Sequence, residues 1–155
     1  MANYAVNNKN AGTQQAISSS YKTLAALFSS ATVRRGKLYD FMFGTNGTPA
    51  DNPMEFDISR MTVDGTGTAT TPNPLDPADA AALTTSKSNY TAEPTVTAAS
   101  SVFYLGINQR ASYRWVAAPG SELVWPATSA NGLVMRALST GYTGTATAEG
   151  LFQEQ

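Results

Sequence analysis

The chain has 155 residues, a length typical of one domain with a buried core, and 42% of them are hydrophobic while only 14% are charged. A net charge of −1 argues against electrostatic capture of nucleic acid or an anionic membrane, and no apolar run approaches the about 20 residues of a membrane-spanning helix. Cys and His are both absent, which excludes disulfides, thiolate or imidazole metal sites, and catalysis by either residue type.

The first twenty residues are polar and small, and only a few isolated apolar residues interrupt them. Without periodicity they predict an extended arm over 1–20, ahead of a single domain over 21–155. Two interpretations stay open. The arm is either a disordered terminus or a segment that orders against a neighbouring subunit, which it would contact through Tyr4 and Val6.

Alternation of apolar and polar residues predicts the next strands. Residues 21–30 fit a helical face as well as a strand, and we favour the strand because no clear helix cap follows. The segment 37–44, KLYDFMFG, has a two-residue period that puts Tyr39, Phe41 and Phe43 on one face.

The segment 53–63, PMEFDISRMTV, has the cleanest alternation in the chain. We expect its apolar face to be buried and its polar face to be wet. The apolar face carries Met54, Phe56 and Ile58, and the polar face carries Glu55, Asp57 and Ser59. A short edge strand is expected over 68–71.

One helix is expected, over 75–83 (LDPADAAAL). Asp76 can cap it, Pro77 fits the first helical position, and Asp79 falls in the electropositive first turn. We interpret it as a short plug over one end of a sheet, followed by a polar loop over 84–94.

The densest aromatic stretch, 101–120 (SVFYLGINQRASYRWVAAPG), predicts a β-hairpin with a polar turn at 108–111. A brief apolar segment follows at 123–126, and later strands are expected at 132–138 and 142–152. About eight strands with turn residues between them, one short helix and no βαβ rhythm predict an all-β domain. We expect a β-sandwich, with the jelly roll as the favoured topology.

Two pairs of acidic residues allow a chemical interpretation. Glu55 and Asp57 share a strand face at about 7 Å, a spacing usable in glycoside hydrolysis, but such pairs are ordinary on a wet face and Arg60 lies nearby. Asp76 and Asp79 carry oxygen ligands suited to calcium, but helix capping explains both. No nucleotide-binding or hydrolase fingerprint occurs. We therefore assign no catalytic, cofactor-binding or metal-binding residue and expect no enzyme.

Basic and aromatic residues gather near the predicted hairpin turn. Two guanidinium groups beside aromatic rings suit a sugar or a base, whereas a structural role has Arg114 covering a strand face and Arg110 on a turn. Arg, Tyr and Trp are also the types most enriched at protein-binding hot spots. We therefore predict protein-interface residues at Arg110, Tyr113, Arg114 and Trp115, together with Tyr4 and Val6 of the arm.

Four segments carry a pattern beyond composition: RRGKLYDFMFGTNGTPADNPMEFDISRMT, LDPADAAAL, SNYTAEPTVTAASSVFYLGINQRASYRWVAAPGSE and the terminal LFQEQ. Over 34–155 this overall pattern resembles the capsid decoration (cement) proteins of tailed bacteriophages, although no short diagnostic motif carries it. The resemblance implies a jelly-roll fold, a homotrimer, and a place at three-fold positions of the capsid lattice. It transfers no catalytic residue.

We therefore expect a virion structural protein, made in the host cytoplasm, that binds the major capsid protein at the outer surface of the shell and stabilises the shell by mass action. No cofactor, nucleic acid or membrane partner is expected. The alternative is a carbohydrate- or receptor-binding β-sandwich, as in a head fibre or a lectin. That function needs an exposed aromatic platform, with Trp115 or Trp125 lying flat at the surface.

Overall fold

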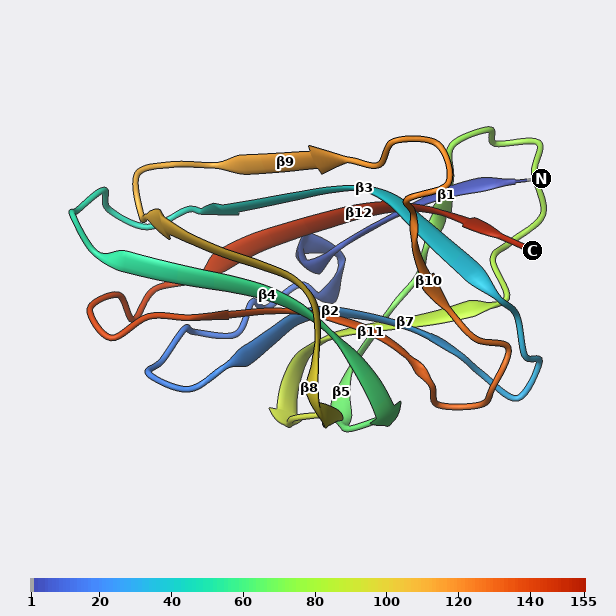
Figure 1. Ribbon diagram of the computed structural model, residues 1–155, viewed down its shortest axis with the longest axis horizontal. Helices are drawn as coiled ribbons and strands as arrows, with labels where there is room; N and C mark the ends of the chain where they lie inside the picture. Colours follow the sequence, from blue (N-terminus) through green and yellow to red (C-terminus); the bar gives the residue numbers. More distant parts are fainter. Residues whose placement is uncertain (1) are drawn as a thin grey trace.

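The computed structural model describes residues 2–155 as two antiparallel β-sheets packed face to face (Figure 1). Sheet A contains β1 (Asn3–Asn7), β3 (Gly36–Thr45), β6 (Asn73–Pro74), β9 (Tyr113–Val116), β10 (Leu123–Trp125) and β12 (Ala146–Glu154). Sheet B contains β2 (Lys22–Ser29), β4 (Pro53–Val63), β5 (Thr66–Thr70), β7 (Thr84–Ala92), β8 (Thr95–Asn108) and β11 (Gly132–Leu138). The predicted all-β sandwich is confirmed. Within 2–155, no helix has the length and apolar character needed to cross a membrane.

The strand order is that of a jelly roll. In sheet A, β1, β12, β3 and then β9 with β10 lie side by side, and in sheet B the order is β2, β11, β4, β8. Along the chain these strands alternate between the sheets, except that β4 and β8 follow one another in sheet B and β9 and β10 follow one another in sheet A. All their pairings are antiparallel. This is the double-sheet arrangement expected of a jelly roll.

Three further strands form an insertion between β4 and β8. β7 pairs with β2 and β5 pairs with β7, so both extend sheet B beyond β2, while β6 pairs with β1 at the border of sheet A. The structure has more strands than the expected number of about eight, for two reasons. The insertion adds three strands, and the border of sheet A next to β3 is divided into the two strands β9 and β10. The insertion covers strand edges of β1 and β2 that would otherwise be free.

Aromatic rings fill the space between the sheets. Phe43 of β3 stacks on Phe56 of β4 with ring centroids 4.7 Å apart, which joins the two sheets. Trp125 is fully buried and meets Phe152 edge-on at 5.6 Å. Gly36 leaves room for that indole, since a Cβ atom at position 36 would overlap the Trp125 ring.

A second, smaller apolar cluster lies on the outer face of sheet B. Leu27 belongs to the main core, whereas its neighbours Ala26 and Phe28 belong to the second cluster, so the two clusters lie on opposite faces of β2. Its other buried members are Met61, Tyr90 and Val134. The predicted strand over 21–30 is confirmed, and burial on both faces explains why it lacks alternation.

The first strand replaces the predicted N-terminal arm. β1 lies between β12 and β6, and the side chains of Tyr4 and Val6 are buried in the main core. Tyr4 stacks on Phe152 with centroids 5.4 Å apart, and its hydroxyl donates a hydrogen bond to the carbonyl oxygen of Ala80 over 3.0 Å. An arm outside the sandwich is therefore wrong for this segment. Its burial comes from pairing with the last strand, which the local sequence does not reveal.

The predicted helix over 75–83 is not formed. The segment turns instead, with the amide of Asp79 donating to the carbonyl of Asp76 over 3.0 Å and the Asp76 carboxylate accepting from the amide of Ala78 over 2.9 Å. So short a helix is marginal without strong packing. The segment still lies against the core, through Ala82. The helical turn of the described chain is instead the 3₁₀ helix η1 (Asn8–Ala11).

The polar segment over 84–94 is mostly a strand, so the loop prediction is wrong. Thr84, Ser86 and Ser88 alternate with more exposed residues along β7 and are all buried. The hydroxyl groups of Ser86 and Thr70 lie 2.7 Å apart and hydrogen-bond across β5 and β7. The period-two pattern is present in this segment, but small hydroxyl residues carry it instead of apolar ones.

Two predicted strand faces need correction. In β3, Asp40 pairs with Leu151 and Leu38 with Phe152, which leaves Tyr39 unpaired in a β-bulge. Leu38 is therefore buried with the core in place of Tyr39. In β4 the apolar face is buried as predicted, but its polar neighbours Asp57 and Ser59 are buried as well instead of facing water.

The predicted hairpin over 101–120 is wrong, although both of its strands exist. β8 pairs with β4 and β9 pairs with β3, so the chain passes from sheet B to sheet A. The turn is present, with the Ala111 amide donating to the Asn108 carbonyl over 2.9 Å. The buried side chain of Gln109 fixes this corner by hydrogen bonds to Asn52 (2.7 Å) and to the carbonyl of Thr48 (2.8 Å).

The position of β1 inside the sandwich gives a direct test. Val6→Asp places an unpaired carboxylate in the core, and we expect loss of the folded state or a large drop in its thermal midpoint. Ala5→Asp, on the opposite and half-buried face of the same strand, is the matched control and should be nearly neutral. Thermal unfolding followed by circular dichroism measures both, and equal effects would contradict the burial of β1.

Candidate functional site

One side of the sandwich stays open between β8 and β9 (Figure 1). β8 is the last strand of sheet B, β9 borders sheet A, and the two strands do not pair. Apolar side chains along this side pack against the core but are only half-buried. We call them the open seam: Val102, Phe103, Ile107, Tyr113, Trp115 and Leu123.

Stacked rings connect the open seam to the core. Phe103 meets Phe41 edge-on at 4.8 Å and lies 5.6 Å from Tyr113, measured between ring centroids. Trp115 stacks on Phe41 at 5.0 Å with an angle of 25° between the ring planes. The predicted contact residues Tyr113 and Trp115 therefore lie together in the seam, each held from the inside by other rings and half open to solvent.

Arg114 points to the other face of β9, the outer face of sheet A. Its Nε donates a hydrogen bond to Oδ1 of the buried Asp40 over 3.0 Å. This hydrogen bonding, together with the negative charge of Asp40, raises the pKa of the Arg114 guanidinium. Met42 and Val116 are exposed hydrophobic residues on the same outer face. This face combines a neutralised ion pair with exposed apolar side chains.

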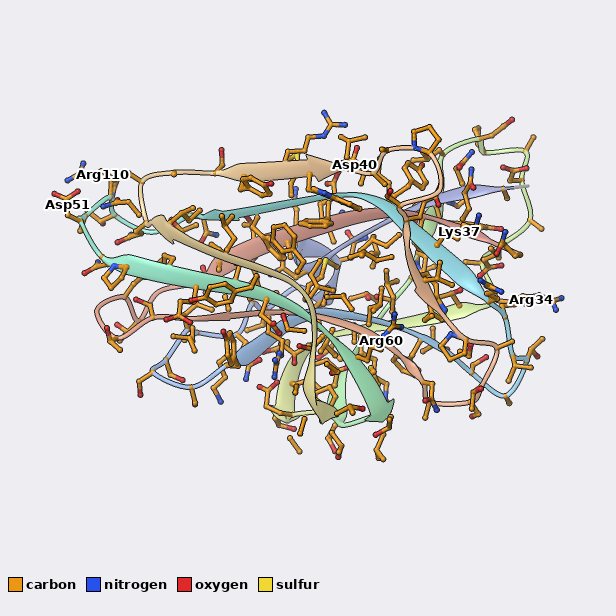
Figure 2. All side chains as sticks on the ribbon, in the orientation of Figure 1. Arg34, Lys37, Asp40, Asp51, Arg60 and Arg110 are labelled. Carbon is orange, nitrogen blue, oxygen red and sulfur yellow. The ribbon has the colours of Figure 1, made fainter. Side chains whose placement is uncertain are left out.

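Arg110 lies apart from both groups, at the corner where the chain changes sheets. Figure 2 shows it beside Asp51 at one end of the molecule, where its Nε donates to Oδ1 of Asp51 over 2.9 Å. The predicted interface residues thus fall on three surfaces: a corner, the open seam and the outer face of sheet A. Tyr4 and Val6 lie inside the sandwich, so a partner could contact them only if β1 left its sheet.

Basic side chains gather toward the opposite end. Arg60 donates from Nη1 to the carbonyl of Val124 over 2.7 Å, which links β4 to β10, and Arg35 and Arg60 both line a shallow hollow there. Figure 2 shows Arg34, Lys37 and Arg60 toward this end, remote from Arg110. None of these cations takes part in a salt bridge within the described residues. We call Arg34, Arg35, Lys37 and Arg60 the basic end.

The two acidic residues considered for catalysis have separate partners. Oδ2 of Asp57 accepts hydrogen bonds from Nε of Arg136 (2.9 Å) and from the hydroxyl of Ser59 (2.7 Å). Glu55 instead accepts a hydrogen bond from the hydroxyl of Tyr21 over 3.3 Å. The partner of Asp57 is therefore Arg136 on β11, and Arg60, which sequence proximity suggested, points elsewhere.

Tyr21 connects these two acids and is strongly perturbed. The Arg136 guanidinium lies 4.5 Å from the centre of its ring. Burial, followed by the charges of Asp57 and Glu55, raises the pKa of Tyr21 to about 12. A hydrogen bond that the hydroxyl of the exposed Tyr104 donates to Glu55 likewise raises the pKa of Tyr104. The cluster borders a hollow of about 460 Å³ beside the first half of β8.

The acidic pair Asp76 and Asp79 lies in the turn that replaces the predicted helix. The Asp76 carboxylate already accepts the backbone hydrogen bond of its own turn. In residues 2–155, no three His, Cys, Asp or Glu side chains come together in a way that could hold a metal ion.

No protein-family model matches the chain, and no curated protein is detectably similar to it.

The sequence did not identify three residues that the structure makes functional candidates. Arg136 is the one charged residue in an otherwise apolar strand, GLVMRAL, and that isolation was the available signal for a buried ion pair. The predicted hairpin over 101–120 puts Phe103 and Tyr113 in one ribbon, so it does not indicate that Phe103 lies in a seam between the two sheets. Tyr21 offered no local signal, since its partners lie on β4 and β11.

The buried ion pair gives a stability prediction. Arg136→Leu leaves the Asp57 carboxylate buried without its partner, and we expect it to lower the free energy of unfolding by about 3–5 kcal/mol. Arg110→Leu breaks the exposed pair with Asp51 and should cost no more than about 1 kcal/mol. Urea unfolding measures both, and equal costs would contradict the structural role of Arg136.

Tyr21 gives a prediction for alkaline pH. Its folded pKa of about 12 exceeds the value near 10 of an unfolded tyrosine, so folding favours the neutral phenol. The stability that this provides is complete below about pH 10 and is lost as the pH rises from about 10 to 12. Tyr21→Phe should therefore lose less unfolding free energy than the wild type across that interval. Identical pH profiles would exclude the predicted shift.

Proposed function

We propose that this protein is a capsid decoration protein of a tailed bacteriophage, which binds the outer surface of the major capsid protein lattice as a homotrimer. The observation that carries the proposal is the uncharged, half-buried aromatic surface of the open seam, which suits contact with protein. It stands beside the resemblance of residues 34–155 to cement proteins. Such a protein stabilises the shell by binding the assembled lattice in many copies.

The distribution of charge supports the same proposal. Five of the ten cationic side chains are held in salt bridges, and the basic end carries four of the others. Within residues 2–155, the open seam and the outer face of sheet A around Arg114 therefore carry no unpaired cation and suit apolar contact with protein. The basic end carries unpaired positive charge that can attract an acidic partner surface. We assign the shell contact to the basic end.

The alternative, a carbohydrate-binding module, loses its predicted platform at Trp125, which is fully buried. Trp115 has one ring face covered by Phe41. Tyr104, with 60% of its surface exposed, is the freest aromatic side chain of the described residues and borders the hollow beside Arg136. A saccharide would stack there, and loss of glycan-array binding in Tyr104→Ala would favour this second function.

The test of the proposed function mixes the purified protein with tailed-phage shells that lack it. The purified protein should co-sediment with these shells to saturation and raise the temperature at which they break apart. Failure to co-sediment and an unchanged disruption temperature would overturn the proposal.

Charge-reversal variants test the contact itself. Arg34→Glu combined with Arg35→Glu should weaken shell binding by at least about tenfold at low salt, because opposite charges steer and hold such contacts. Arg110→Glu, at the other end of the molecule, is the matched control and should bind as the wild type does, because assigning the shell contact to the basic end gives up the predicted role of Arg110 in that contact. Equal binding by all three proteins would place the shell contact elsewhere.

A further inference from the structure

β8 is a long strand with one free edge. It has 14 residues and ends sheet B, with β4 as its one partner strand. Apart from the pairing with β4, no backbone–backbone hydrogen bond within residues 2–155 involves Val102–Ile107, and the Phe103 carbonyl accepts one side-chain bond, from the Ser101 hydroxyl over 3.0 Å. A row of backbone donors and acceptors along this edge therefore lacks a protein partner in the single chain.

The register identifies the free groups. The amide of Gln109 donates to the carbonyl of Asn52 over 2.9 Å, so residue 109 directs its backbone groups toward β4. Because Gly106 pairs with Glu55 and Tyr104 with Asp57, antiparallel alternation gives these two residues the opposite orientation. The N–H and C=O groups of Tyr104 and Gly106 point away from β4, along the free edge.

Bulges interrupt the pairing of the first part of β8 with β4, but its regular part, Phe103–Asn108, lacks two other features that usually protect an edge strand. Charged residues, above all Lys, and Pro prevent edges from pairing with other chains, yet Thr95–Asn108 contains neither. The remaining sheet borders are shorter. β6 has two residues and includes Pro74, β10 has three and is followed by Pro126, and β9 has four and carries Arg114. The other border strand of sheet B, β5, also lacks charged residues and Pro but has five residues, so β8 is the longest unprotected border strand.

We propose that the free edge of β8 pairs with a strand from a second copy of this chain and forms its subunit interface. A strand is the partner because only another backbone supplies a matching row of donors and acceptors. A copy of this chain is favoured because its own border strands β8 and β5 carry no charged residue, so pairing between them brings no like charges together and leaves no charge without a partner. Pairing at this edge also brings the neighbour over the adjacent open seam and covers its half-buried rings.

This interface deepens the proposed function and rests on it for the number of subunits. In a closed trimer β8 meets a different edge of the next subunit, whereas in a dimer with two-fold symmetry it meets another β8. The edge pairing itself needs no capsid. It is therefore testable on the purified protein, independently of shell binding.

The experiment compares the mass of three proteins across a concentration series by analytical ultracentrifugation. Gly106→Pro removes one free edge N–H and none of the bonds to β4, so it should weaken self-association by at least about tenfold. Gly106→Ala keeps the N–H and is the matched control, since a Cβ atom at position 106 meets nothing within 4 Å. It should assemble as the wild type does.

A second variant protects the test against a backbone effect of proline. Tyr104→Lys places a charge beside the edge without changing the backbone, and it should also weaken assembly by about tenfold. Circular dichroism confirms that each variant is folded. A wild-type monomer at all concentrations, or assembly that neither variant changes, would overturn the interface. A dimer would support the edge pairing and remove the trimer from the proposed function, and failure of shell binding alone would leave the interface standing.

Discussion

The whole sandwich depends on the pairing of its first and last strands. β1 and β12 lie side by side inside sheet A, with Asn3 opposite Gln153 and Asn7 opposite Glu149. The buried side chains of Val6 and Phe152 belong to the same core cluster as the rings of β3 and β4. Because this pairing joins the two ends of the chain, the core is complete only when the entire sequence has folded.

The two sides of the sandwich, where the edges of the sheets lie, differ in how they are covered. On one side, the insertion between β4 and β8 covers the edges of β1 and β2, and Ala82 packs against the core nearby. On the other side no strand of the described chain pairs with the free edge of β8 or covers the outward sides of the rings in the open seam. A protein that closes one border with its own strands and leaves the other uncharged has a surface suited to another polypeptide. The proposed assembly follows from this asymmetry.

Charged groups fall into two classes with different consequences. The pair of Asp57 and Arg136 is nearly buried and fixes the outer face of sheet B together with Ser59 and Tyr21. The pair of Arg110 and Asp51 is exposed at a corner, where water screens it. Among residues 2–155, only the basic end keeps several cations outside such pairs, and its unpaired charge is available to a partner.

The sequence by itself determined the fold class, most strand positions, and the inward faces of segments with strict apolar alternation such as Met54, Phe56 and Ile58, because a period of two is a local property. It failed where burial came from distant partners. Tyr4 and Val6 are buried in the core because β1 pairs with β12. Buried hydroxyl residues, not apolar ones, form the inward face of β7, and a bulge in β3 buries Leu38 instead of Tyr39. The same holds for the candidate site. Residue types indicated contact residues near 110–115, but they did not indicate on which surface of the sandwich each one lies. Only the tertiary structure decided that β8 and β9 belong to different sheets, because strand pairing depends on contacts between residues far apart in the chain.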